Sequence, residues 1–220
     1  MQNAMKSLPK TPNHKIFCDK LNDPAVTIVL ATGAAGTGKT HMSVSYAVFK
    51  LLSKCIKKII ITRPTVPLEE ELGHLPGKLQ DKMHPYLIPM YDSLKEYMTP
   101  ARLQEYLVNE EIDICAIAHI RGRTFHDSWI LVDEAQNLTR NQFKTLLTRI
   151  GQNSKMVLSG DLQQSDLKEN NGLQDFVDKF KQHTLEYGTL HPIDLVEFGE
   201  EDIMRSDIVK RVLHIYDSSS

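Results

Sequence analysis

The sequence has few cysteines, little excess charge and no long apolar run, and each absence excludes a class of protein. Its 220 residues include only three cysteines, Cys18, Cys55 and Cys115, which are widely spaced and form no C-x-x-C pair. This pattern argues against a disulfide framework and against a structural zinc site. It is typical of a protein in a reducing, cytoplasmic compartment.

Charge and hydropathy exclude two further classes. The chain carries 26 basic and 28 acidic residues, so a polyanion has to be met by a local patch, because the overall field does not attract it. No stretch reaches the roughly 18 consecutive apolar residues of a membrane helix. The first residues also lack the apolar core of a signal peptide. We therefore expect neither membrane insertion nor secretion.

Apolar runs alternate with helical patterns along the chain. A run that is apolar at nearly every position is typical of a strand covered on both faces, as in a parallel sheet with helices on both sides. A chain of this length suits one such α/β domain. The expected strands are residues 27–31, 58–62, 112–118, 129–133 and 155–159.

The clearest helix signal is the segment TRNQFKTLLTRIG. Thr139 is the expected N-cap, Gln142 completes a capping box, and Gly151 is the expected C′ residue. The apolar stripe at helical spacing comprises Phe143, Leu146, Leu147 and Ile150.

A long insert, residues 64–111, separates the second and third expected strands. It contains several prolines and two amphipathic segments, YLIPMYDSLKEYM and PARLQEYLV. Loops of this length within a compact domain are usually functional.

The segment GAAGTGKT matches the phosphate-binding pattern G-x-x-x-x-G-K-[ST] between a strand candidate and a helical pattern. Its glycines let backbone N–H groups approach phosphate oxygens, and the helix directs the positive end of its dipole at the anion. Lys39 would contact the β- and γ-phosphates, and Thr40 would offer its hydroxyl to Mg²⁺. The expected nucleotide-binding residues are Gly33, Ala34, Ala35, Gly36, Thr37, Gly38, Lys39 and Thr40.

An acidic pair follows the apolar run of ILVDEAQN. Asp133 would hold Mg²⁺, and Glu134 would orient and deprotonate the attacking water. The alternative is a solvated pair that caps the next helix. The phosphate-binding pattern upstream favours the catalytic interpretation.

A third apolar run ends in SGDLQQSDL. The amide of Gln163 could sense or position the γ-phosphate, because it offers both a donor and an acceptor. A polar turn explains the same residues, and spacing alone does not decide between the two.

Together these segments resemble the PhoH-like family of P-loop ATPases, whose RecA-like domain is similar to the first motor domain of superfamily one helicases. The resemblance is carried by ATGAAGTGKT, ITRPTV, LGHLPGKLQDKMHPYLIPMYD, IAHIRGRTFHDSWILVDEAQNLT, SKMVLSGDLQQSDL and EEDIMRSDIVKRVLHIYD. It implies a mostly parallel RecA-like sheet over residues 13–217. Residues 1–12, which are polar and contain two prolines, and residues 218–220 are expected to be flexible tails. The resemblance equates DEAQ with the Walker B motif and favours Gln163 as a γ-phosphate sensor.

The segment TPNHKIF resembles the family's adenine-contacting segment, in which a glutamine is usual. This chain has His14 instead. A glutamine can pair with both N6 and N7 of adenine, whereas a neutral imidazole has one donor and one acceptor in fixed geometry. The resemblance therefore implies that His14 contacts the base but leaves adenine selectivity open.

Three arginines are candidates for contact with nucleic acid. Arg63 follows a strand at the edge where ligands of such sheets bind, and the corresponding helicase motif touches single-stranded backbone. RGRT adds Arg121 and Arg123. The alternative is that these arginines cover apolar surface or pair with nearby acids. No aromatic platform suggests readout of base sequence.

The resemblance implies an ATPase that uses Mg²⁺ and acts on RNA or another single-stranded nucleic acid. A helicase motor closes two such domains over ATP, so we expect a homo-oligomeric ring, such as a hexamer, in which a neighbour supplies Arg205 or Arg211. A different class also fits: a nucleotide-gated module that controls a nuclease or another partner without unwinding. DEAQ and GDLQQ disfavour a third class, a small-molecule kinase.

Overall fold

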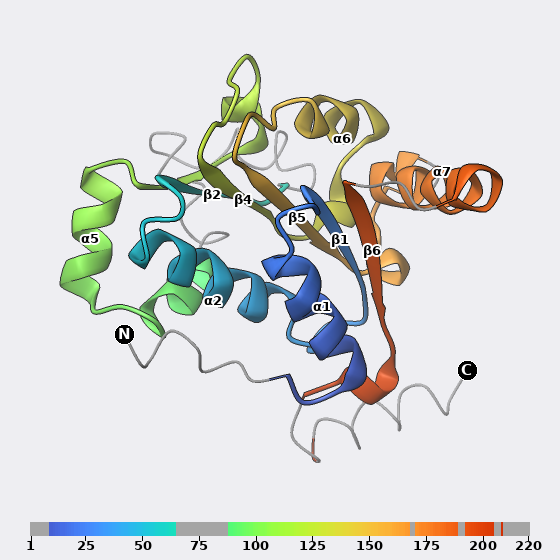
Figure 1. Ribbon diagram of the computed structural model, residues 1–220, viewed down its shortest axis with the longest axis horizontal. Helices are drawn as coiled ribbons and strands as arrows, with labels where there is room; N and C mark the ends of the chain where they lie inside the picture. The colour runs from blue at the N-terminus through green and yellow to red at the C-terminus, as the bar shows by residue number, and fades with distance from the viewer. Residues whose placement is uncertain (1–8, 65–87, 168–169, 189–191, 205–207, 209–220) are drawn as a thin grey trace.

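A six-stranded parallel sheet forms the centre of the molecule (Figure 1). The computed structural model describes residues 9–64, 88–167, 170–188, 192–204 and 208. The strand order is β3-β2-β4-β5-β1-β6, and every neighbouring pair is parallel. The strands are β1 Ile28–Gly33, β2 Lys58–Thr62, β3 Ile112–Cys115, β4 Ser128–Val132, β5 Lys155–Gly160 and β6 Ile193–Phe198.

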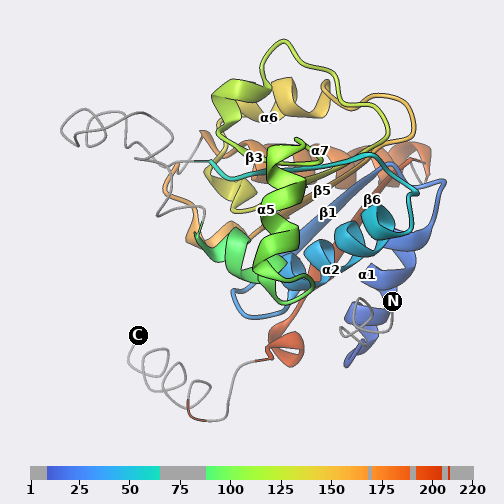
Figure 2. The same cartoon turned by 90° about the vertical axis from the view of Figure 1, so that its left-hand side faces the viewer.

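Helices cover both faces of this sheet. Figure 1 shows α1, α2 and α5 on one side and α6 and α7 on the other, and Figure 2 shows α5 standing beside the edge near β3. This is the RecA-like α/β arrangement expected from the sequence. The helices are α1 Pro12–Asn22, α2 Lys39–Leu52, α5 Pro100–Val108, α6 Arg140–Leu147 and α7 Gly172–Tyr187.

The core lies in two apolar layers, one on each face of the sheet. Along β1, Val29 and Ala31 belong to the layer under α1 and α2, while Ile28 and Leu30 belong to the layer under α6 and α7. Neighbouring strands divide their side chains in the same way. Burial on both faces explains why the strands are apolar at nearly every position, since neither face meets water.

One strand was not predicted from the sequence, and another is shorter than predicted. Strand β6 pairs with β1 at the edge of the sheet, but its sequence, IDLVEF, is only partly apolar because an edge strand is less enclosed. Strand β3 ends at Cys115 rather than at residue 118, and residues 117–120 form a 3₁₀ turn.

Helix α6 has the expected start but ends early. The capping box between Thr139 and Gln142 is present. The helix ends at Leu147 with Thr148 as its C-cap, so the assignment of Gly151 as the C′ residue was wrong. Gly151 is instead required by close packing, because a Cβ there would lie 2.5 Å from the carbonyl oxygen of Phe125.

The second half of the insert is part of the core. Helix α5 coincides with the amphipathic segment PARLQEYLV, and residues 88–95 form another helix. Met90, Leu94 and Leu103 are buried against the α2 side of the sheet. Residues 65–87 of the insert lie outside the described part of the chain.

Helix α1 begins at Pro12 with Thr11 as its N-cap, at the end of the expected N-terminal tail. None of the helices in the described ranges has the length and apolar character that a bilayer crossing requires. The three cysteines are free thiols, of which Cys18 and Cys115 are buried.

Candidate functional site

The phosphate loop, Gly33–Thr40, connects β1 to α2 and depends on glycine at two positions. Gly33 has a φ of +140°, and a Cβ there would lie 2.4 Å from the carbonyl oxygen of Phe198. Gly38 is the N-cap of α2 with a φ of +82°. Only glycine adopts both conformations without strain or collision. The loop therefore turns sharply from the sheet into the N-terminus of α2.

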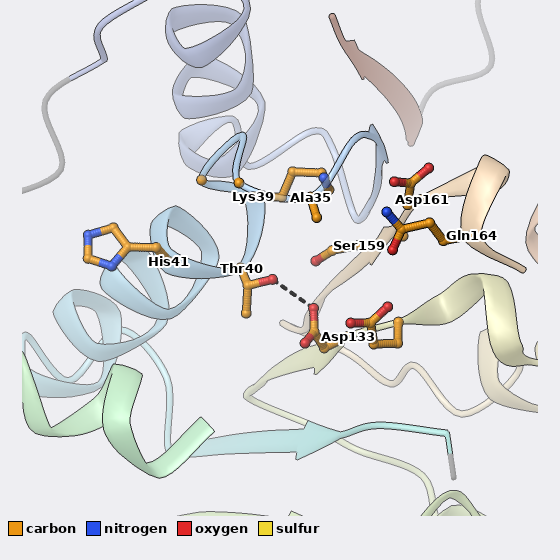
Figure 3. Close-up of a pocket in the computed structure, with 12 residues that line it drawn as sticks. Ala35, Lys39, Thr40, His41, Asp133, Ser159, Asp161 and Gln164 are labelled. Carbon is orange, nitrogen blue, oxygen red and sulfur yellow. Dashed lines mark hydrogen bonds between the residues drawn. The ribbon is translucent and has the colours of Figure 1, made fainter. Parts of the chain in front are cut away.

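A pocket of about 210 Å³ lies where the carboxyl ends of β1, β4 and β5 meet (Figure 3). Because β5 lies between β1 and β4, the segments that follow these three strands converge at one edge. The pocket is lined by Ala35, Gly36, Gly38, Lys39, Thr40, His41, Asp133, Glu134, Ser159, Gly160, Asp161 and Gln164.

Lys39 lies across the phosphate loop. Its ammonium donates hydrogen bonds to the carbonyl oxygens of Gly33 at 2.7 Å and Ala34 at 2.8 Å, and to the hydroxyl of Thr37 at 2.9 Å. Burial lowers the pKa of Lys39, and the nearby carboxylates, chiefly that of Asp161, oppose this shift. All three ammonium donors are satisfied, so a buried cation is held ready beside an anion-binding loop.

Thr40 and Asp133 bring the loop and the end of β4 together. The Thr40 hydroxyl donates to Asp133 Oδ1 at 2.7 Å, as the dashed line in Figure 3 marks. Burial raises the pKa of the Asp133 carboxyl, against the lowering effect of this hydrogen bond. A hydroxyl and a carboxylate oxygen at this distance are the hard donors that Mg²⁺ prefers, so these two residues fit such an ion.

Glu134 is held by two neighbours in an unusual backbone conformation. Its φ of +53° lies in the left-handed region, which is uncommon for glutamate and often occurs at functional sites. One carboxylate oxygen accepts from Arg63 at 3.0 Å and the other from Gln136 Nε2 at 2.6 Å. The turn after β4 therefore presents this carboxylate to the pocket in a defined orientation.

Gln136 is a site residue that the sequence analysis did not identify. Its side chain is buried and joins two strand ends, because Nε2 donates to Glu134 while Oε1 accepts from the backbone N–H of Asp161 at 3.1 Å. Gly160 is needed for this contact, since a Cβ there would lie 2.7 Å from Gln136 Oε1. The only sequence signal was its place as the last letter of DEAQ.

The turn after β5 presents Gln164 to the pocket rather than Gln163. Gln164 and Asp161 are part of the pocket wall (Figure 3). Gln163 is exposed, and its backbone N–H donates to Asp161 Oδ1 at 3.0 Å. The role of Gln163 as a γ-phosphate sensor stays a prediction, and Gln164 is the glutamine that lines the pocket.

A second missed residue, His41, connects the insert to the pocket. It lies in the first turn of α2 and lines the pocket (Figure 3). Its Nε2 lies 2.8 Å from the hydroxyl of Tyr97, which follows the helix at residues 88–95. The sequence offered no signal for this pairing, because the two residues are far apart along the chain.

His14 lies behind the phosphate loop. It is buried, and its Nε2 is 2.9 Å from the carbonyl oxygen of Thr37. His14 is not among the residues that line the pocket. Its predicted contact with the base therefore has a competing explanation, since the ring is already engaged by the loop.

The candidate nucleic-acid residues have different surroundings. Arg63 contacts Glu134, as above, and lies 3.9 Å from Asp133. Arg123 pairs with Asp113 at 2.8 Å and lies over the ring of Phe125, so the predicted alternative of a local acid partner applies to it. Arg121 is exposed. The two candidates for a neighbour's site lie outside the described residues: Arg205 and Arg211.

A protein-family comparison matches residues 7–217 to the family described as PhoH-like protein. The chain belongs to the PhoH-like family. It is 40% identical to a PhoH-like protein of Mycobacterium leprae over 94% of this chain and 58% of that protein. It is 38% identical to Protein PhoH of Escherichia coli K12 over 86% of this chain and 52% of that protein. The PhoH-like domain thus spans a little over half the length of these relatives.

A solved structure, the Sulfolobus solfataricus SWI2/SNF2 ATPase core in complex with dsDNA, aligns with 91% of this chain and 47% of its own. The TM-score is 0.45 and the identity is 16%. Family membership and the loop geometry together identify a P-loop nucleotide-binding protein. P-loop families of this kind in general use a nucleotide together with a metal ion.

The buried carboxylate of Asp133 leads to a prediction about how stability depends on pH. Its raised pKa means that the native state binds a proton more tightly than the unfolded chain does. The stability it contributes is complete below the ordinary aspartate pKa of about 4 and is lost as the pH rises through the raised value. In metal-free buffer, Asp133→Asn should raise the melting temperature by a few degrees at pH 7, and the gain should shrink toward pH 4.

Asp127 provides the matched control. It lies before β4, at the opposite end of the strand, and the hydrogen bond from Lys57 lowers its pKa. Asp127→Asn should therefore not stabilise the protein at pH 7. A lower melting temperature for Asp133→Asn across the whole pH range would contradict the prediction.

Proposed function

We propose that this PhoH-like domain hydrolyses ATP with Mg²⁺ and couples the reaction to RNA. The observation that carries the proposal is the convergence of Lys39, Thr40, Asp133 and Glu134 on one pocket. These residues come from two segments, the phosphate loop at the start of α2 and the turn after β4, and they are the cation, metal ligands and base that phosphoryl transfer needs.

Lys39 and the loop would bind the phosphates. The ammonium now donates to two loop carbonyls and a hydroxyl, which are neutral acceptors. Phosphate oxygens are charged acceptors and form stronger hydrogen bonds. Nucleotide binding would therefore exchange the ammonium's contacts with the loop for contacts with the β- and γ-phosphates.

Thr40 and Asp133 would hold Mg²⁺. The ion, when bound, neutralises charge on the phosphate oxygens during the reaction. The present hydrogen bond keeps both ligands together, so little rearrangement is required of them. Asp161, which also lines the pocket, adds a further carboxylate oxygen to this edge.

Glu134 would orient the attacking water and accept its proton. The water oxygen forms a bond to the γ-phosphorus as the bond to the β,γ-bridging oxygen breaks, which yields ADP and phosphate. Gln136 holds one oxygen of this carboxylate and is itself fixed by the backbone of Asp161. A movement at the end of β5 would therefore shift Gln136 and, through it, the carboxylate of Glu134.

Arg63 supports the coupling to RNA. Arg63 follows the end of β2, at the edge predicted to bind the RNA backbone, and its guanidinium donates to Glu134, the proposed catalytic base. A phosphodiester that attracted Arg63 would alter its contact with Glu134. The second candidate function, a nucleotide-gated module for a nuclease or other partner, uses the same pocket without turnover stimulated by RNA.

The catalytic roles are tested by two substitutions. Lys39→Ala should largely abolish nucleotide binding, because it removes the charge that binds the ground state. Glu134→Gln should retain binding but reduce turnover by about a hundredfold or more, because it removes the base. Binding is measured by calorimetry and turnover by phosphate release. A fully active Glu134→Gln protein would remove Glu134 from the mechanism.

The RNA contacts are tested by removing single arginines. Replacement of Arg63, Arg121 or Arg123 by alanine should weaken RNA binding alike for all sequences and lower the salt slope by about one counterion each. Lys57→Ala is the control, because Lys57 directly precedes β2, at its other end. Arg123→Ala should also lower stability, since Arg123 pairs with Asp113. Equal slopes for all variants would favour the gating function.

We also propose that the active form is a homo-oligomeric ring in which Arg205 or Arg211 reaches a neighbour's nucleotide. An arginine supplied in trans can increase the rate by about 10³ or more. Mixing inactive Lys39→Ala subunits with inactive arginine variants should restore part of the turnover, because a mixed interface can pair one intact loop with one intact arginine. Light scattering in the presence of ATP measures the assembly, and an active monomer would refute the proposal.

A further inference from the structure

We infer that His14 is a positioning residue for the phosphate loop, held in place by the chain segment that follows β6. The inference rests on the nucleotide-binding part of the proposed function. It assigns the histidine a role toward the phosphates and not toward the base.

The ring of His14 is fully engaged within the protein. It is 2% exposed, and the backbone N–H of Lys10 donates to its Nδ1 at 3.4 Å. A nitrogen that accepts this bond carries no proton, so in the neutral ring the proton lies on Nε2. Nε2 then donates to the carbonyl oxygen of Thr37 at 2.9 Å.

This bond determines the orientation of a peptide group in the loop. In a trans peptide the C=O and the following N–H point in opposite directions. Because the Thr37 carbonyl is turned toward His14, the N–H of Gly38 is turned away from it. Gly38 lines the pocket and opens α2, where N–H groups bind anions.

The preceding peptide is held in the same way from a second segment. The backbone N–H of Met204 donates to the carbonyl oxygen of Gly36 at 2.9 Å. The N–H of Thr37 is therefore turned away from Met204 by the same geometry. Two successive loop carbonyls are thus fixed by donors from elements that lie outside the P-loop motif.

Asp202 joins the two segments that provide these donors. It is completely buried, and its carboxylate accepts from the Thr11 hydroxyl, from Asn13 Nδ2 at 2.8 Å and from the Gly199 N–H at 2.9 Å. Thr11 and Asn13 flank the start of α1, close to His14. We call His14, Asp202 and Met204 the loop clamp.

The clamp explains why His14 is absent from the pocket wall although the segment TPNHKIF resembles an adenine-contacting segment. A base-contacting residue needs a free polar atom toward the ligand, whereas both ring nitrogens of His14 have protein partners. A positioning residue affects every ligand that uses the loop. A base contact affects only ligands that carry the matching base.

The experiment compares His14→Phe and His14→Gln with the wild type. Phenylalanine keeps an aromatic ring beside Phe198 but has no donor, while glutamine keeps an amide donor for Thr37. Affinities for ADP, GDP and inorganic tripolyphosphate are measured by calorimetry with Mg²⁺. None of these measurements requires hydrolysis, so an inactive wild type would refute the ATPase proposal without touching this one.

His14→Phe should lower the affinities for all three ligands by a similar factor of about ten. One oriented hydrogen bond is lost, and a buried carbonyl is left without its donor. His14→Gln should restore most of the affinity. Loss confined to ADP, with tripolyphosphate unchanged, would show a base contact and overturn the inference. Unchanged affinity for all three ligands would overturn it as well.

Asp202→Asn tests the other end of the clamp and does not alter the ring. An amide has a single acceptor oxygen, so it can accept either from Asn13 and Gly199 or from the Thr11 hydroxyl, but not from all three donors. Asp202→Asn should lower the affinities for ADP, GDP and tripolyphosphate together. It tests the inference even if His14→Phe does not fold. Asp178→Asn, an exposed position on α7, is the matched control and should leave all three affinities unchanged.

Discussion

The site depends on one constraint: the carboxyl ends of β1, β4 and β5 must meet at the same edge of the sheet. These strands are adjacent in space in the order β4-β5-β1, although more than ninety residues separate β1 from β4 in the chain. The hydrogen bond from Thr40 to Asp133 spans the full width of that arrangement. A shift of register in β5 would separate the two residues and remove the pocket.

Concentrating charge at this edge has a cost in stability. Burial lowers the pKa of Lys39 and raises that of Asp133, so each would be more easily accommodated as a neutral group. Glu134 adds backbone strain in the left-handed region. Natural proteins keep such unfavourable groups where function requires them, and here each one has a specific partner. Lys39 is held by its hydrogen bonds to the phosphate loop, and Glu134 is held by those from Arg63 and Gln136.

The P-loop motif shapes its loop only in part, through the bonds that Lys39 and Thr37 make within it. Gly33 packs closely against β6. The carbonyl of Thr37 is hydrogen-bonded by His14 of α1, and the carbonyl of Gly36 by the backbone N–H of Met204 in the turn after β6. Helix α1 and this turn are joined by a buried carboxylate, that of Asp202. Elements close to both ends of the described chain thus converge on the residues that would bind phosphate. This arrangement makes the loop sensitive to changes far away in the sequence.

The sequence by itself determined the fold class, five of the strands, the start of α6, and the identity of the loop and acidic motifs. These features are local, because burial on both faces appears as a continuous apolar run and a capping box lies within four residues. Only the tertiary structure decided that Gln136 joins β4 to β5, that Arg63 contacts Glu134, and that His14 lies behind the loop. The first two contacts join residues brought together by strand order, and the third joins a helix to the loop. A single sequence carries no local signal for such neighbours, because they are distant along the chain.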